Sequence, residues 1–293
     1  MNNITYSIII PHKNSPDLLK RCINSIPKRD DVQIIIIDDN SSKDIVDFNS
    51  FPGLDIKSVE VFFTKTNRGA GYARNIGLKN ARGKWLLFAD ADDYYAPNFL
   101  DIIDANIQEN IDILFYNVYS TDIQIFDRAS KINQDYDEYF NNNDVNIIKF
   151  KNWAPWNKVV SRRLVEQFNL SFDEIPVGND AMFSLNASCK AKEIKVIPDR
   201  LYCVTHQPQS ITYKPMTSER IFSYSKINIK INKFLLKLNL ADYQIAVTSP
   251  YNIYRVYKEK GIKYTFKYMK YISDNYSLLR ALCLYVKIKN RNK

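Results

Sequence analysis

The stretch Val-Gln-Ile-Ile-Ile-Ile-Asp-Asp-Asn-Ser-Ser at residues 32–42 decides how the rest of the chain is interpreted. Its apolar half is β-branched and unbroken, which favours a strand buried on both faces in the middle of a parallel sheet. Its polar half follows directly at the end of that strand. Because ligands bind beyond the carboxyl ends of strands in open parallel sheets, we expect a ligand site at Asp38 and Asp39.

Short β-branched runs alternate with amphipathic segments on both sides of this stretch. That alternation is typical of an α/β fold with a mostly parallel central sheet flanked by helices. The expected strands are residues 6–10, 32–37, 59–63, 85–88 and 111–115. The expected helices begin at Pro16 and cover residues 70–81 and 97–108.

The second half of the chain is less regular. Residues 120–150 are polar and are expected to be irregular, and a helix is expected at residues 179–187. Two short strands are expected at residues 194–197 and 201–205. From Thr217 the chain consists of successive helical segments rich in Lys, Tyr and Ile. We therefore expect a first domain at residues 1–215 and a helical, basic C-terminal region at residues 216–293.

Composition narrows the class of protein. The 293 residues are 45% hydrophobic and carry a formal net charge of +9, with the basic excess strongest after Arg255. Such a chain can bury one large core, or one core and a smaller appendage. The four cysteines lack metal-ligand spacing, and no signal peptide or membrane-spanning stretch is recognisable, so a cytoplasmic protein is expected.

The chemistry is expected where polar residues follow the strands. Two acidic clusters, at Asp38 and at Asp90-Ala91-Asp92, come at the ends of strands predicted to be parallel. Neighbouring carboxylates repel each other unless a cation or a hydrogen-bonding ligand lies between them. Mg²⁺ and Mn²⁺ prefer carboxylate oxygens and usually bind one or two of them together with substrate phosphates. The sequence therefore predicts a divalent cation at Asp90 and Asp92.

A set of short motifs occurs in one order along residues 5–212. They are Ser7-Ile8-Ile9-Ile10-Pro11, Ile37-Asp38-Asp39-Asn40-Ser41-Ser42, Asn67-Arg68-Gly69, Ala73-Arg74-Asn75-Ile76-Gly77, Ala81-Arg82-Gly83, Phe88-Ala89-Asp90-Ala91-Asp92-Asp93, Trp156-Asn157-Lys158 and Gly178-Asn179-Asp180. In these motifs and their order the chain resembles glycosyltransferase family two, of the GT-A nucleotide-sugar-binding fold. A lone Asp-x-Asp is weak evidence, but the ordered set is specific.

The resemblance implies roles for the residues at the donor side. Pro11 and Asp39 would line the nucleobase pocket, and Asp38 would orient the loop. Gly69 and Arg74 would also belong to the donor-nucleotide site.

The resemblance also implies a metal site. Asp90 would face the ribose and the metal, and Asp92 would bind the Mn²⁺ or Mg²⁺ that bridges the two phosphates of the donor. His206, which follows the last expected strand, would complete the metal ligands.

On the acceptor side the resemblance implies an inverting transfer in which Asp180 acts as the general base. Trp156 and Asn179 would contact the acceptor. The family usually has Glu-Asp where this chain has Asn179-Asp180, so one charge is missing beside the base.

The resemblance favours a uridine diphosphate sugar as donor and a bacterial surface glycan, or its lipid-linked precursor, as acceptor. The sugar and the linkage stay open. Tyrosines and phenylalanine alternate with lysines near the C-terminus, which predicts that this region contacts an anionic membrane surface or a partner. The aromatic side chains of that pattern are Tyr264, Phe266, Tyr268, Tyr271 and Tyr285.

Two other classes of protein stay open. A haloacid-dehalogenase-type phosphatase also has Asp-x-Asp after a strand, although at its first strand and with Thr or Ser soon after. Here the motif at Asp90 follows the fourth expected strand, and Tyr94 comes next. The net charge also suggests a non-catalytic nucleic-acid-binding module. Carboxylates at the binding edge argue against that module, so no nucleic acid is expected as a partner.

Overall fold

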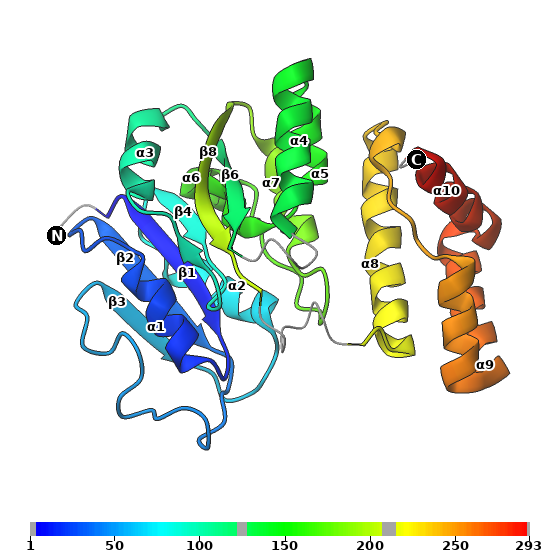
Figure 1. Ribbon diagram of the computed structural model, residues 1–293, viewed down its shortest axis with the longest axis horizontal. Helices are drawn as coiled ribbons and strands as arrows, with labels where there is room; N and C mark the ends of the chain where they lie inside the picture. Colours follow the sequence, from blue (N-terminus) through cyan, green and yellow to red (C-terminus); the bar gives the residue numbers. More distant parts are fainter. Residues whose placement is uncertain (1–3, 122–127, 207–214, 292–293) are drawn as a thin grey trace. The chain divides into compact units, whose positions relative to one another are not determined.

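The protein is described here by a computed structural model that covers residues 4–121, 128–206 and 215–291 (Figure 1). Contacts divide these residues into two compact units. The first contains residues 4–175 and 179–206, and the second contains residues 176–178 and 215–291.

The first unit is built on one sheet, which has eight strands within the described residues in the order β3-β2-β1-β4-β7-β6-β8-β5. The strands are β1 (Tyr6–His12), β2 (Val32–Asp38), β3 (Val59–Phe63), β4 (Trp85–Phe88), β5 (Tyr94–Tyr95), β6 (Ile113–Ser120), β7 (Lys158–Ser161) and β8 (Ile194–Val204). The first four strands are parallel, and β6 is parallel to β8. Only β7 and β5 run against their neighbours, so the predicted mostly parallel sheet is confirmed.

Helices cover both faces of this sheet. They are α1 (Pro16–Asn24), α2 (Ala70–Asn80), α3 (Phe99–Asn106), α4 (Arg128–Asn142), α5 (Val145–Lys151), α6 (Arg162–Gln167) and α7 (Ala181–Lys190), with a short 3-10 turn, η1 (Pro155–Asn157). Side chains of α1 and α3 pack with Ile34 and Ile36 on one face, whereas side chains of α2, α6 and α7 pack with Ile35 and Ile37 on the other. The isoleucine run is thus buried on both faces, as the sequence predicted.

Two predictions about secondary structure were wrong. The stretch expected to be irregular contains α4 and α5. Asp144 caps the first turn of α5, where its side chain accepts a hydrogen bond from the main-chain N–H of Asn146 (2.9 Å). The two short strands expected after residue 193 are one strand, β8, which continues through register shifts opposite Tyr116–Val118. In addition, the short strands β5 and β7 and the helix α6 were not expected.

The second unit contains α8 (Ser218–Lys237), a 3-10 turn η3 (Ala241–Tyr243), α9 (Pro250–Tyr276) and α10 (Leu278–Arg291). Its apolar core includes Ile221, Phe222, Val256, Tyr268 and Ile272. Helix α9 is kinked at Gly261, where φ is 74°. None of the helices that the structure describes is both long enough and apolar enough to cross a membrane.

Candidate active site

The loop after β1 and β2 is held together by the buried carboxylate of Asp38. Its Oδ1 lies 2.8 Å from Nδ1 of His12, and its Oδ2 accepts a hydrogen bond from the main-chain N–H of Ser41 (2.9 Å). Nε2 of His12 accepts from the main-chain N–H of Ser15 (3.1 Å), so the ring donates to Asp38 through Nδ1. Burial raises the pKa of Asp38, but the hydrogen bonds from His12 and Ser41 outweigh it and lower the pKa overall.

Asp39 connects this loop to the start of α2. One of its carboxylate oxygens accepts a hydrogen bond from the main-chain N–H of Arg68 (2.9 Å), and the other accepts from that of Gly69 (2.7 Å). Gly69 has φ 89° at the N-terminus of α2, a backbone conformation that favours glycine. Pro11 pairs in register with Ile37 at the adjoining end of β1. The structure thus brings the predicted donor residues Pro11, Asp38, Asp39 and Gly69 to one edge of the sheet.

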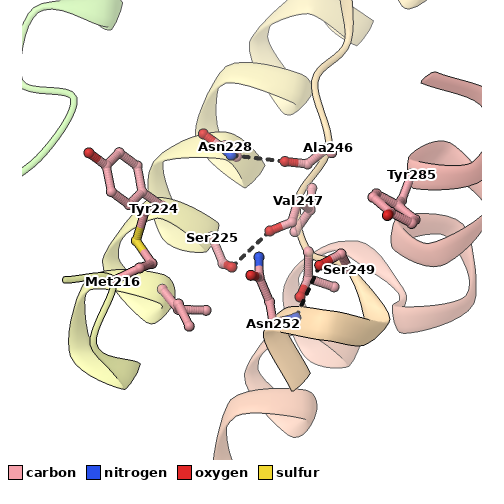
Figure 2. A pocket seen from close by; sticks show the side chains of 11 residues that line it. Met216, Tyr224, Ser225, Asn228, Ala246, Val247, Ser249, Asn252 and Tyr285 are labelled. Atoms are coloured by element: carbon pink, nitrogen blue, oxygen red, sulfur yellow. Dashed lines mark hydrogen bonds between the residues drawn. The ribbon is translucent and has the colours of Figure 1, made fainter. Parts of the chain in front are cut away.

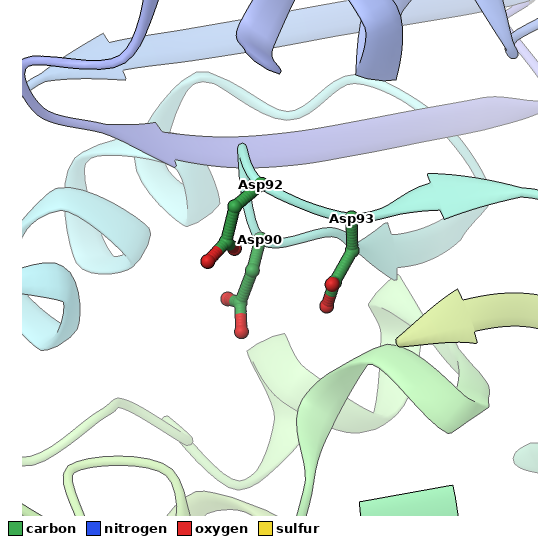
Figure 3. Close-up of side chains that lie close together, drawn as sticks. All are labelled: Asp90, Asp92 and Asp93. Carbon is green, nitrogen blue, oxygen red and sulfur yellow. The ribbon is translucent and has the colours of Figure 1, made fainter. Parts of the chain in front are cut away.

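The loop that follows β4 gathers three carboxylates, Asp90, Asp92 and Asp93 (Figure 3). One ligand oxygen from each lies within 4.8 Å of the others. Mg²⁺ usually binds one or two protein carboxylates and takes its other oxygen ligands from water and phosphates, so two of these three carboxylates are enough to hold a divalent cation here. The predicted ligand His206 is not part of this group, whereas Asp93, for which no ligand role was predicted, is.

The end of β8 holds this acidic loop in place. The main-chain N–H of Asp90 donates to the hydroxyl of Tyr202 (2.8 Å). Thr205 donates through its main-chain N–H to Oδ1 of Asp93 (2.7 Å) and through its hydroxyl to the main-chain oxygen of Asp92 (2.5 Å). The position of the loop therefore depends on a strand more than a hundred residues further along the chain.

Arg74 connects the acidic loop with the segment before α7. Its guanidinium is buried and donates to Oδ1 of Asp90 (2.5 Å) and to Oδ1 of Asn179 (2.8 Å). Asn179 is neutral, so its contact with Arg74 is a hydrogen bond only, whereas Asp90 forms an ion pair with Arg74. The side chain that precedes the predicted base is thus held by a residue that also holds a predicted metal ligand.

Asp180 is half-buried at the N-terminus of α7, and its main-chain oxygen accepts from the N–H of Ser184 (3.0 Å). Burial raises the pKa of this carboxyl above its usual range, although Arg74 and Lys158 act in the opposite direction. A carboxylate with a raised pKa accepts a proton more readily, which is what a general base requires.

Lys158, for which no role was predicted, is fully buried beneath this segment. Its ammonium donates to the main-chain oxygens of Asn152 (3.2 Å) and Ala154 and lies 3.5 Å from the hydroxyl of Ser184 on α7. Burial lowers its pKa to about 7, an effect that Asp180 partly opposes. The motif Trp-Asn-Lys was visible in the sequence, but a lysine is exposed far more often than buried, so its position could not be foreseen.

Trp156 does not fit the role predicted for it. Its indole is 1% exposed and stacks on the ring of Tyr202, with ring centroids 5.2 Å apart. The side chain is part of the core and has no surface to offer to an acceptor. Asn179 remains beside Asp180 and half-buried.

Comparisons with known proteins identify the family and the fold of this chain. A family model described as glycosyl transferase family 2 matches residues 7–168. The chain is 27% identical over 234 residues to the uncharacterized glycosyltransferase EpsJ of Bacillus subtilis, a match that covers 73% of this chain and 66% of that protein. It is 28% identical over 206 residues to a poly(ribitol-phosphate) beta-glucosyltransferase of Bacillus spizizenii, covering 67% of this chain and 31% of that protein. The chain therefore spans less than two thirds of the length of either relative.

Two solved structures share the fold. S. aureus TarS 1-349 in complex with UDP-GlcNAc is 19% identical with a TM-score of 0.64, covering 94% of this chain and 77% of that one. The mannosyltransferase PcManGT from Pyrobaculum calidifontis in complex with GDP-Man and Mn²⁺ is 13% identical with a TM-score of 0.56, covering 98% and 80%. At these identities the likeness concerns the fold, which is of the GT-A type. Because the family model covers more than half of the chain, from β1 to the end of α6, the protein belongs to glycosyltransferase family 2.

Proposed function

We propose that this protein is an inverting, metal-dependent glycosyltransferase that transfers a sugar from a uridine diphosphate sugar to a hydroxyl group of a surface glycan or its lipid-linked precursor. The observation that carries the proposal is the link through Arg74, which joins the carboxylates after β4 to the segment that bears Asp180. Such an arrangement fits a sugar transfer in which a cation stabilises the leaving diphosphate and a base takes the proton of the acceptor hydroxyl.

The donor is proposed from the chemistry of the loop at Asp39 and from the similar structures. TarS was solved with UDP and with UDP-GlcNAc, and PcManGT was solved with GDP-Man. Asp39 already accepts two main-chain hydrogen bonds, and its oxygens retain further acceptor capacity for the imide N–H of uracil.

The proposed reaction forms one bond at the anomeric carbon and breaks another. The acceptor oxygen attacks that carbon, the bond to the diphosphate oxygen breaks, and the hydroxyl proton moves to the carboxylate of Asp180. Attack on the face opposite the diphosphate inverts the configuration of the carbon. A cation bound at Asp90 and Asp92 would neutralise the charge that develops on the diphosphate. Arg74 keeps Asp90 and Asn179 in position throughout.

A peripheral contact with an anionic membrane is also proposed, through Phe266 of the expected aromatic side chains together with Ile262, which was not among them. Tyr268 is fully buried, and Tyr264 and Tyr271 pack against the core of the second unit. Among the exposed apolar side chains of α9 are Ile262 and Phe266, which are 55% and 62% exposed and are four residues apart. The helical period turns every third or fourth side chain inwards, which the count of aromatic residues alone did not reveal.

Release of nucleotide from the donor tests the proposed function. Purified protein is incubated with a panel of UDP-sugars and GDP-sugars, with Mn²⁺ and with a chelator in parallel. We expect slow, metal-dependent release of UDP from one UDP-sugar. Phosphate release from a model phosphate ester without turnover of any nucleotide sugar would instead support a phosphatase.

A further inference from the structure

The second unit contains a cavity of about 210 Å³ between α8, the segment before α9, the first turn of α9, and α10 (Figure 2). Eleven residues line it, and none is charged. The surrounding helices carry many lysines, so the absence of charge from this lining is notable. The ligand that it fits is therefore neutral, since a phosphate or a carboxylate would be left without a counter-charge.

The polar groups on one wall are held by the main chain of the segment before α9. The amide nitrogen of Asn228 donates to the oxygen of Ala246 (2.9 Å), which leaves its Oδ1 as an acceptor. The hydroxyl of Ser225 donates to the oxygen of Val247 (2.8 Å). Because both side chains are already fixed, a ligand that binds there loses little free energy in ordering the wall.

The first turn of α9 supplies a side-chain amide. The main-chain N–H of Asn252 donates to the hydroxyl of Ser249 (3.0 Å), which caps the helix. Its side-chain amide has no hydrogen-bond partner within the described part of the chain and points towards Ser225 across the cavity in Figure 2. A carboxamide offers two donors and one acceptor, so it can bind a hydroxyl group in either sense.

Two tyrosines, Tyr224 on α8 and Tyr285 on α10, add aromatic surface and a hydroxyl each. The volume lies below the roughly 300–1,000 Å³ of pockets that enclose drug-sized ligands, which limits the occupant to about one ring. Amides, hydroxyls and aromatic rings without charge complement a molecule that has hydroxyl groups on its edge and C–H groups on its faces.

We propose that this cavity binds one neutral sugar ring, a hexose or an N-acetylhexosamine. That the ring belongs to the acceptor glycan rests on the proposed function, whereas the binding itself rests on the cavity. The second unit would then retain a glycan by a residue other than the one that reacts.

The test measures binding of methyl glycosides of glucose, galactose and N-acetylglucosamine to the full chain by saturation-transfer NMR. Saturating UDP is present to occupy the proposed nucleotide site. Asn252→Ala removes the free amide but keeps the main-chain bond to Ser249, and we expect it to weaken binding about tenfold, the scale of one hydrogen bond. The matched control is Asn275→Ala, also half-buried on α9, whose amide donates to the oxygen of Tyr271 (2.9 Å); this change should leave binding unaltered.

A second variant guards against loss of folding. Tyr224→Phe removes one hydroxyl and little volume, and it should weaken binding severalfold while the melting temperature stays that of the parent. Equal binding by the parent, Asn252→Ala and Tyr224→Phe would overturn the proposal, as would binding of inorganic phosphate in place of the glycosides. Release of UDP from the donor should be unchanged in Asn252→Ala. If the parent released no UDP from the donor, the proposed function would be contradicted, but the proposal that the cavity binds glycosides would not be affected.

Discussion

Arg74 is the side chain on which the two halves of the candidate active site meet. It binds a carboxylate of the proposed cation site and the amide next to the proposed base, and it is buried where it does so. Hydrogen bonds between ionised groups at low exposure are stronger than those at the surface. The proposed base and the proposed metal ligands therefore shift together if Arg74 shifts.

Substitutions at Asp180 and Asp39 should separate proton transfer from donor binding. Asp180→Asn keeps the size of the side chain but cannot accept a proton at neutral pH, so transfer to an acceptor should fall roughly 10²-fold or more while UDP binding survives. Calorimetry with UDP and a transfer assay measure the two effects.

Asp39→Asn is the counterpart. An amide has a single acceptor oxygen, so one of the main-chain N–H groups of Arg68 and Gly69 loses its partner. UDP binding should weaken first, and transfer at saturating donor should be affected less.

Near-normal transfer by Asp180→Asn would mean that the base lies elsewhere, with Asp173 and Glu174 next to be tested.

The carboxylate of Asp92 should control the dependence on a divalent cation. In Asp92→Ala the cation site loses an oxygen ligand, and release of UDP from the donor should fall by roughly 10²-fold at a given Mn²⁺ concentration. Asp101→Ala removes an exposed carboxylate from the first turn of α3 and is the control. Turnover by Asp92→Ala in the presence of chelator at the rate of the parent with Mn²⁺ would contradict a metal at this site.

Helix α4 was missed in the sequence because most of its side chains are polar. The apolar side chains of α4 that reach the hydrophobic core include Ala129, Ile132, Tyr136 and Tyr139, at spacings of three and four residues. That spacing is helical, but the Asn and Asp residues around it favour turns and obscured it. The helix also buries a carboxyl group, Asp135, which is 7% exposed.

The pH dependence of stability should report on Asp135. Burial raises its pKa from 3.8 to about 6, although Lys151 and Lys131 oppose the shift. A group whose pKa is higher in the folded chain contributes stability below pH 3.8, and this contribution is lost as the pH rises through about 6.

Asp135→Asn should therefore increase the free energy of unfolding at pH 8 by about 1–3 kcal/mol and have a smaller effect at pH 5. Urea denaturation at both pH values measures this. The exposed neighbour Asp137→Asn should change stability little at either pH. If the two variants behave alike, burial of Asp135 does not affect its ionisation.

The excess of basic residues in the whole chain is strongest after Arg255, in the same region as the exposed apolar side chains of α9. Beyond the kink at Gly261, exposed Ile262 and Phe266 are accompanied by exposed Lys263 and Lys267. Apolar side chains can enter the interface of a bilayer while lysines bind its anionic headgroups, with about 1 kcal/mol from each lysine.

Sedimentation with anionic vesicles should show this contact. The double variant Lys263→Gln and Lys267→Gln should bind such vesicles about tenfold or more weakly than the parent. Lys233→Gln with Lys237→Gln removes the same charge at the same spacing from α8 and should bind as the parent does. Equal losses in the two variants would mean that net charge alone, and not this face, is responsible.

The first strands and the carboxylates that follow them could be predicted because each depends on residues close together in sequence. The isoleucines before Asp38 and the apolar run before Asp90 identify buried strands and their ends. The long-range contacts could not be predicted in this way. The stacking of Trp156 on Tyr202 and the burial of Lys158 beneath α7 depend on packing between distant segments. A short sequence motif does not show that packing.

The neighbours β4 and β7 are joined by all the chain between residues 88 and 158, whereas β1 to β4 follow one another directly. During synthesis, the four parallel strands and the carboxylates after β4 therefore leave the ribosome first. At roughly 5–20 residues per second, Asp180 emerges about 5–20 s after Asp90. During that interval Asp90 is already synthesised, but Asn179, the second hydrogen-bond partner of Arg74, is not. The acidic loop and Arg74 are therefore present in the nascent chain for seconds before the proposed base is synthesised.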